Sequence, residues 1–123
     1  MIDHVGIGVR DYAAGKAFYE QALVPLGMSL VMEVGEAAAG FGKDGKPTFW
    51  LEKLRTPVTE VHVAFLAKDR ATVDAFHAAG LVAGGKDNGA PGVRATYHPN
   101  YYGAYVLDPD GNNIEAVCHT PAA

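Results

Sequence analysis

The sequence HVGIGV at residues 4–9 contains the clearest structural signal in the chain. Val5, Ile7 and Val9 alternate with His4 and two glycines, which predicts a β-strand that is buried on one face only. The opposite face of this strand carries an imidazole and almost no other side-chain bulk. A strand of this kind packs on a helix and leaves its histidine facing an open space.

A helix and three further strands are predicted directly after this strand. Asp11 is a candidate N-cap, and apolar residues at helical spacing continue from it until Pro25 or Gly27 ends the helix. Three strand-like segments then follow at residues 28–34, 37–42 and 48–52, the last two joined by a hairpin turn at Asp44-Gly45.

The same pattern recurs 58 residues later. This shift aligns His4-Val5 with His62-Val63 and Asp11 with Asp69, and nine of the 24 positions from His4 to Gly27 are identical without a gap. We therefore expect an internal duplication, with one module at about residues 1–55 and a second at about residues 60–119. Both modules belong to a single domain, residues 1–123, because the chain is too short for two full-sized domains.

The second module departs from the first after its helix. Residues 84–92 are rich in turn formers and resemble a lid or loop over the cavity rather than a strand. The final strands are expected at residues 101–107 and 113–118, with Asp108-Pro109-Asp110-Gly111 as the turn between them.

These elements predict an α+β fold. Neither half-unit of one strand, one helix and three strands can bury its own sheet, so the two βαβββ modules should pair. The expected product is one curved, mixed eight-stranded sheet, mostly antiparallel, with both helices outside and a cavity on the concave face.

Composition excludes several classes of protein. Fourteen Asp and Glu against ten Lys and Arg give a net charge of -4, which argues against nucleic acid as a partner. No segment resembles a signal peptide or a membrane span. Cys118 is the single cysteine and cannot form an internal disulfide, so we expect a cytoplasmic protein.

Strand alternation predicts which side chains face the cavity. His4 and His62 face it if the valines that follow them pack on the helices, and on the last strand Glu115 turns inward in the same way. On the fourth strand Trp50 and Glu52 point inward. Two imidazoles and one or two carboxylates are a ligand set for a divalent transition metal.

Two motifs resemble those of a known superfamily. The paired starts His4-Val5-Gly6-Ile7 and His62-Val63-Ala64-Phe65, with the ending from Tyr105 through Asp108-Pro109-Asp110-Gly111 to Glu115, are similar to the vicinal oxygen chelate superfamily. It includes glyoxalase I, bleomycin-resistance proteins, fosfomycin-resistance enzymes and extradiol dioxygenases. The resemblance extends from His4 to Cys118.

The resemblance implies a funnel of paired βαβββ modules that holds a divalent metal ion, which could be Ni, Zn, Co, Mn or Fe. His4, His62 and Glu115 match the metal-binding positions, and Glu52 matches the additional carboxylate of glyoxalase I. Glu60 is a rival to Glu52, because it shares a strand face with His62. The resemblance also implies a homodimer, with the cavity built either within one chain or between two.

The expected function is that of a metal-dependent lyase or isomerase of glyoxalase type, acting on a small substrate with vicinal oxygens. Glu52 or Glu115 would act as the base, and Trp50, His98 and Tyr105 are candidate substrate contacts. One alternative is an Fe(II)-dependent dioxygenase-like enzyme that uses only His4, His62 and Glu115. Another is a non-catalytic drug- or metabolite-binding protein of bleomycin-resistance type. No arginine cluster suited to glutathione is recognisable in the sequence.

Overall fold

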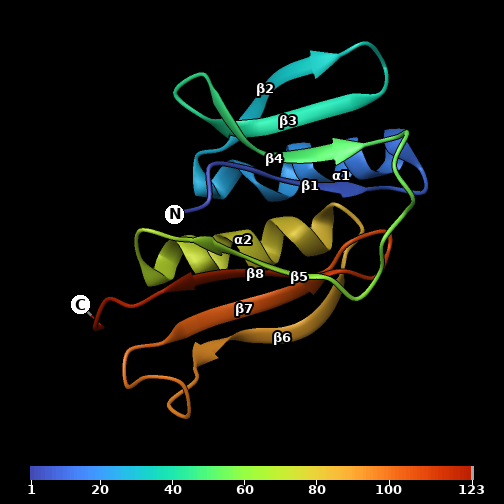
Figure 1. Cartoon of the computed structure of the whole chain (residues 1–123). Helices are drawn as coiled ribbons and strands as arrows, with labels where there is room; N and C mark the ends of the chain where they lie inside the picture. Colours follow the sequence, from blue (N-terminus) through green and yellow to red (C-terminus); the bar gives the residue numbers. More distant parts are fainter. Residues whose placement is uncertain (123) are drawn as a thin grey trace.

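The computed structural model describes residues 1–122 and contains two helices and eight strands in duplicated order. The first module consists of β1 (Val5–Gly8), α1 (Tyr12–Ala22), the short 3₁₀ helix η1 (Val24–Leu26), β2 (Ser29–Val34), β3 (Ala38–Lys43) and β4 (Lys46–Glu52). The second consists of β5 (His62–Leu66), α2 (Arg70–Val82), β6 (Lys86–Val93), β7 (Tyr102–Leu107) and β8 (Asn113–Cys118). The predicted α+β fold of two βαβββ modules is confirmed (Figure 1).

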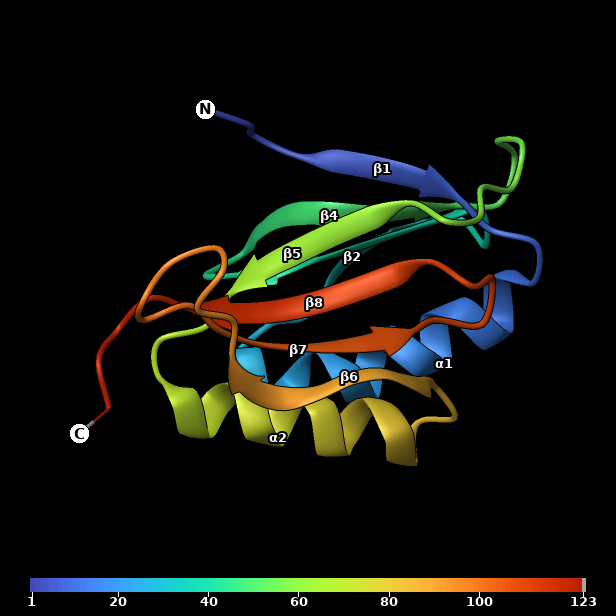
Figure 2. The same cartoon turned by 90° about the horizontal axis from the view of Figure 1, so that it is seen from below.

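The strands form two four-stranded sheets with the same internal order. One sheet has the order β1-β4-β3-β2 and the other β5-β8-β7-β6. In each sheet the first strand pairs in parallel with the last strand of its module, and the remaining pairs are antiparallel. Both helices lie on the same side of the two sheets, and the opposite faces are left open (Figure 2).

The two helices begin at the predicted N-cap residues, and the first hairpin turns at the predicted pair Asp44-Gly45. Asp11 accepts a hydrogen bond from the Ala14 N–H at 3.0 Å, and Asp69 accepts one from the Thr72 N–H at 2.8 Å. Asp44 and Gly45 both have positive φ, 51° and 75°, as a two-residue turn of type I′ requires.

The Gly-rich segment of the second module is a strand and not the lid that its composition suggested. Residues Lys86–Val93 form β6, which pairs with β7 through a ladder interrupted on both sides of Gly89. Glycines in a strand often mark bulges or the close approach of another group, so turn-forming residues here belong to an irregular edge strand.

The hydrophobic core lies between the helices and the two sheets. Phe18 and Phe76 from the helices and Phe49 from β4 are at most 1% exposed, and each such side chain contributes about 1.5–3 kcal/mol of burial free energy. The rings of Phe49 and Phe65 meet at 5.3 Å between centroids, which joins the first module to the second.

A buried polar cluster in the Asp-Pro-Asp-Gly-Asn segment also joins the modules. The Tyr19 hydroxyl of α1 donates to Asp108 Oδ2 at 2.6 Å, and the Asn112 side-chain amide donates to the same oxygen at 3.0 Å. Asn112 Oδ1 accepts from the Val61 N–H at 3.0 Å, just before β5. Burial and the Asp108 charge hold the pKa of Tyr19 well above its usual range, so this hydroxyl stays protonated and donates. This motif therefore fixes the relative placement of the two modules.

No helix within residues 1–122 is both long and apolar enough to cross a membrane.

Candidate functional site

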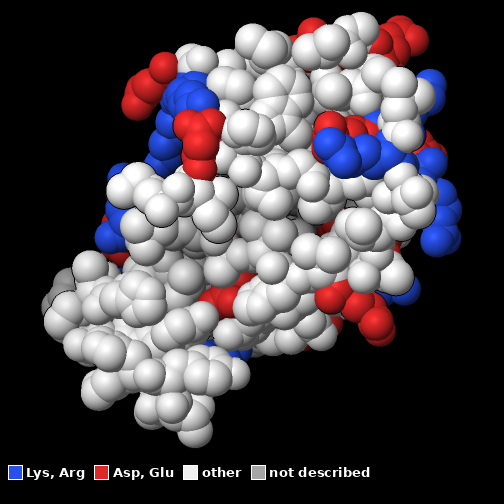
Figure 3. All heavy atoms as spheres, viewed as in Figure 1, with Lys and Arg blue, Asp and Glu red and all other residues white. Residues whose placement is uncertain are grey.

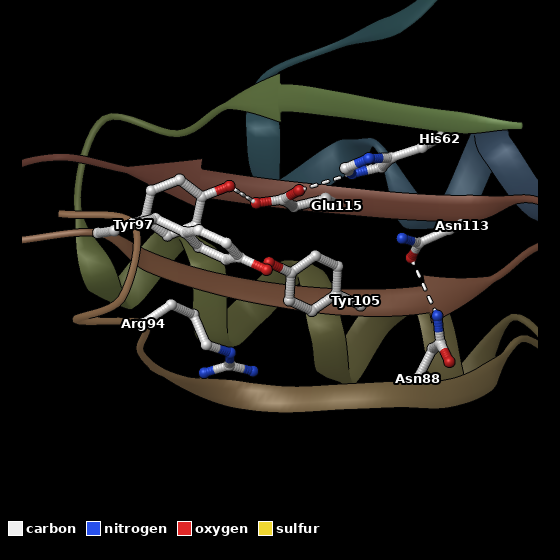
Figure 4. Close-up of a pocket in the computed structure, with 8 residues that line it drawn as sticks. His62, Asn88, Arg94, Tyr97, Tyr105, Asn113 and Glu115 are labelled. Atoms are coloured by element: carbon white, nitrogen blue, oxygen red, sulfur yellow. Dashed lines mark hydrogen bonds and ion pairs between the residues drawn. The ribbon is translucent and has the colours of Figure 1, made fainter.

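The open face of each sheet contains a pocket, and the predicted ligands divide between them. We call the pocket on the second sheet the C-terminal pocket (Figure 4). It has a volume of about 620 Å³ and is lined by His62, Asn88, Arg94, Tyr97, Tyr101, Tyr105, Asn113 and Glu115.

Glu115 is the buried centre of the C-terminal pocket. It lies in the middle of β8, opposite Ala64 of β5, and is 0% exposed. His62 Nε2 lies 2.7 Å from Glu115 Oε1, and the Tyr101 hydroxyl donates to Oε2. A Cβ atom at Gly103 would lie 3.2 Å from Glu115 Oε2, so a glycine on β7 leaves room for the carboxylate. Both carboxyl oxygens thus have a polar partner, as a buried polar group requires.

The environment of Glu115 also keeps Tyr101 protonated. Burial and, as a smaller contribution, the hydrogen bond to Glu115 raise the pKa of Tyr101 well above its usual range. A phenol that does not ionise remains a donor at neutral pH, so this hydroxyl serves as a fixed anchor for the carboxylate.

The N-terminal pocket lies on the first sheet and has a volume of about 810 Å³. Three of the predicted site residues line it: His4, Trp50 and Glu52. The charged residues Asp3, Lys46 and Arg55 also line it, and Met32 and Val34 of β2 add apolar surface. The Glu52 carboxylate pairs with Arg55 Nε at 2.5 Å, and its side chain remains 28% exposed. A Cβ atom at Gly6 would lie 2.5 Å from Glu52 Oε2, which explains the bare face of β1 beside His4.

His4 differs from its counterpart in the second module in the carboxylate that it contacts. Its Nδ1 lies 2.7 Å from Asp3 Oδ2, and its side chain is 59% exposed. The Asp3 carboxylate also pairs with Lys46 at 2.8 Å. His62 is similarly exposed, at 53%, but its partner Glu115 is fully buried, whereas Asp3 is 64% exposed.

The four predicted ligands do not meet within one chain. No group of three or more His, Cys, Asp or Glu side chains suited to a metal ion occurs within residues 1–122. The strands β1 and β5 run in opposite directions and begin at opposite sides of the molecule (Figure 2). His4 directly precedes β1, and His62 is the first residue of β5. Within the single chain the four side chains therefore do not share the one concave face that strand alternation predicts: His4 and Glu52 line one pocket, and His62 and Glu115 line the other.

Two other predicted residues lie outside these pockets. Glu60 lines neither of them and adopts a positive φ of 61° just before β5. His98 also lines neither; its Nδ1 accepts the Asn100 N–H at 3.0 Å, and its ring meets that of His119 edge-on at 5.9 Å. Tyr105 and Trp50 do line pockets, one in each module.

Two side-chain contacts in the C-terminal pocket could not be predicted from the sequence. Tyr101 stands just before β7 and bonds Glu115, and Arg94 lies over the Tyr105 ring at 5.4 Å from its centroid. Neither contact has a local sequence signal, because both depend on how β6, β7 and β8 pair.

A comparison with family models bears directly on these paired modules. The model of the Glyoxalase/Bleomycin resistance protein/Dioxygenase superfamily matches residues 1–116. The chain belongs to this superfamily. Its members typically use divalent metals, and most bind small molecules.

Solved structures of the superfamily share the fold along nearly the whole chain. A glyoxalase/bleomycin resistance protein from Albidiferax ferrireducens T118 is 31% identical, with a TM-score of 0.81 and coverage of 98% of this chain and 99% of that chain. A superfamily enzyme from Burkholderia phytofirmans PsJN is 22% identical, with a TM-score of 0.74 and coverage of 96% and 98%. A lactoylglutathione lyase from Agrobacterium tumefaciens is also 22% identical, with a TM-score of 0.70 and coverage of 96% and 92%. A search of curated proteins found no match.

The donor chemistry of this superfamily member suits a divalent transition metal. One pocket offers His4 and Glu52, the other His62 and Glu115, and together they supply two imidazole nitrogens and two carboxylates. Such a set is complete only if both pockets contribute to one centre.

Proposed function

We propose that the protein is a metal-dependent lyase or isomerase of glyoxalase type and that two copies of the chain complete each metal site. The observation that carries this proposal is the division of the predicted ligands between two open sheet faces: His4 and Glu52 line one pocket, and His62 and Glu115 line the other. A homodimer that places the N-terminal pocket of one copy over the C-terminal pocket of the other would unite His4 and Glu52 with His62 and Glu115.

The two carboxylates would have different roles. Glu115 is fully buried and is held by His62 and Tyr101, which suits a ligand that stays in place. Glu52 is partly exposed and is held only through Arg55, which suits a carboxylate that moves. We therefore assign Glu52 as the base that removes a carbon-bound proton from the substrate.

A divalent metal, when bound, supplies Lewis-acid polarisation of neighbouring substrate oxygens. The chain's own residues would orient the substrate and exclude water. Trp50 in the N-terminal pocket and Tyr105 in the C-terminal pocket would supply apolar surface on which the substrate packs. The single Cys118 is buried and unpaired, as expected in the reducing cytosol, where we place this activity.

Mixing two inactive variants tests the shared site. His4→Ala and Glu115→Ala should each abolish metal uptake and the formation of lactoylglutathione from methylglyoxal and glutathione. If the ligands come from two copies, a dimer of one chain of each variant has one intact site and one doubly damaged site. Unfolding the variants together and refolding them should restore activity and metal, measured by elemental analysis.

Two outcomes separate the possible failures. Restored metal without lactoylglutathione formation would retain the site but change the reaction, and anaerobic Fe(II) loading followed by catechol and oxygen-uptake assays would then test the dioxygenase alternative. A mixture that remains metal-free, although the wild type takes up metal, would contradict the shared site. The control is a mixture of His4→Ala with Glu52→Ala. Both changes lie in the N-terminal pocket, so neither site of the mixed dimer is intact and mixing should not restore activity.

One observation favours a second candidate function, the binding of a small molecule without catalysis. His62 and Tyr101 already satisfy both oxygens of Glu115, and the C-terminal pocket contains three tyrosine rings. A protein that takes up no metal, and whose ligand binding survives His4→Ala and Glu115→Ala, would belong to this class.

A further inference from the structure

Arg94 is a cation in the C-terminal pocket without a carboxylate partner. Its side chain follows the end of β6 and is half-buried, with the guanidinium 5.4 Å from the centroid of the Tyr105 ring. Its one hydrogen bond within residues 1–122 runs from Nη2 to the carbonyl oxygen of Ala90, at 2.7 Å. No ion pair in that part of the chain includes it. The remaining donors of its planar fork are available to an anion.

Glycines of β6 make room for this side chain. A Cβ atom at Gly92 would lie 3.0 Å from Arg94 Nη1, and one at Gly89 would lie 3.3 Å from Nη2 and 2.6 Å from the Tyr105 ring. Side chains at these positions would push the guanidinium away from the tyrosine. The glycine-rich composition of this irregular strand therefore allows Arg94 to fold back over the pocket.

The surroundings of Arg94 define the kind of anion that fits. His62 and Arg94 both lie against Tyr105, with ring centroids of His62 and Tyr105 6.3 Å apart, so one ring separates the metal-ligand side from the cation (Figure 4). The phenol groups of Tyr97 and Tyr105 point toward one another beside it (Figure 4).

The charge and the surface of the C-terminal pocket favour a ligand that has a single negative charge and a flat apolar body. Arg94 is the single Lys or Arg among the residues lining this pocket, and Glu115 supplies an opposing charge. The three tyrosine rings offer flat apolar surface, and charged side chains gather mainly at the margins of the open face (Figure 3). A monoanionic carboxylate meets this balance better than a phosphate, which has a charge between -1.5 and -2 at neutral pH.

We propose that the substrate is a small carboxylic acid with a flat apolar body and that Arg94 binds its carboxylate in a bidentate manner. The vicinal oxygens would lie on the far side of Tyr105, beside His62 and Glu115, and this part of the assignment rests on the proposed function. Arg94 then favours anionic over neutral substrates.

Benzoate and benzamide test the anion subsite because they have the same shape and differ in charge. Isothermal titration with metal-free protein keeps the test independent of metal uptake and lyase activity. Wild-type protein should bind benzoate more tightly than benzamide, and Arg94→Gln should weaken benzoate binding about tenfold while leaving benzamide unchanged. Gly92→Ala should weaken benzoate binding less, since it displaces only the far end of the Arg94 side chain.

Lys86→Gln is the matched control, because Lys86 is a cation at the other end of the same strand and does not line the pocket. It should leave both affinities unchanged. The assignment is overturned if benzoate does not bind, if it binds no better than benzamide, or if Arg94→Gln keeps the wild-type affinity. Tighter binding of phenyl phosphate than of benzoate would overturn the carboxylate class. A protein that passes these tests but takes up no metal would retain this subsite and lose the proposed lyase function.

Discussion

The two modules have the same topology but hold their histidine-carboxylate pairs differently. In the second module His62 and Glu115 contact each other directly at 2.7 Å, and the carboxylate is completely buried. In the first module His4 pairs with Asp3 and Glu52 with Arg55, and both side chains are partly exposed. The second module therefore has an imidazole in direct contact with a buried carboxylate, whereas the imidazole and the carboxylate of the first module are each bonded to other, more exposed side chains.

This difference suggests a division of labour between the modules. A preorganised donor pair loses little conformational entropy when it binds a metal, whereas a loosely held pair can adjust to a substrate or a second chain. The comparison leads to predictions in which each change in one module is set against a chemically similar change in the other.

The largest difference is expected between Glu115→Gln and Glu52→Gln. Glu115→Gln should reduce metal affinity by more than the ~10–100-fold typical of losing a group that only orients a ligand. Glu52→Gln should retain more metal but slow turnover by ~10²–10⁴-fold, because the amide cannot accept a proton. Elemental analysis and activity per bound metal separate the two effects, and equal metal loss in both variants would contradict the assigned roles.

A smaller difference is expected between Tyr101→Phe and Tyr12→Phe. Tyr101→Phe removes a donor from the buried Glu115 carboxylate and should reduce the free energy of unfolding by about 1–3 kcal/mol. Tyr12→Phe removes a similar hydrogen bond, 2.6 Å long, to Glu33, but Glu33 is accessible to water and the loss should be smaller. Urea denaturation measures both, and the reverse order would mean that Glu115 is not the more tightly held carboxylate.

The smallest difference is expected between the two helix caps. Asp69 accepts from both the N–H and the hydroxyl of Thr72, at 2.8 and 2.6 Å, whereas Asp11 accepts from the Ala14 N–H alone. Asp69→Ala should therefore lower the urea midpoint more than Asp11→Ala.

The pH dependence of this effect follows from the Asp69 carboxyl. Hydrogen bonds from the Thr72 side chain and backbone lower its pKa below the ordinary 3.8, so its stabilising contribution is complete above that value. It is lost as the pH falls through the lowered pKa of the folded state. The difference between wild type and Asp69→Ala should shrink below pH 3.8, and a constant difference would mean that the charge of the cap does not contribute.

Much of the fold could be predicted because its signals are local. The alternating apolar residues of β1, the caps at Asp11 and Asp69 and the turn at Asp44-Gly45 depend on neighbours within a few residues. The strand β6 could not be recognised, because its glycines serve a contact with Arg94 and Tyr105 rather than a turn.

The sequence named candidate site residues but did not place them relative to one another. Alternation identifies the strand face on which His4 and His62 lie, and it carries no information about the direction in which β1 and β5 run relative to each other. That direction follows from the packing of the helices and from the bond between Tyr19 and Asp108. It separates the ligand pairs into two pockets.

The sequence alone determined the duplicated modules, the superfamily and the residue types that face each open sheet, because periodicity and repeats are properties of the chain. Only the tertiary structure decided that His62 and Tyr101 contact the buried Glu115 carboxylate and that His4 and Glu52 lie apart from it. It also decided that Arg94 lies over Tyr105 in the same pocket as Glu115. These contacts join residues on different strands, and their free energy depends on burial that exists only after the sheets have paired.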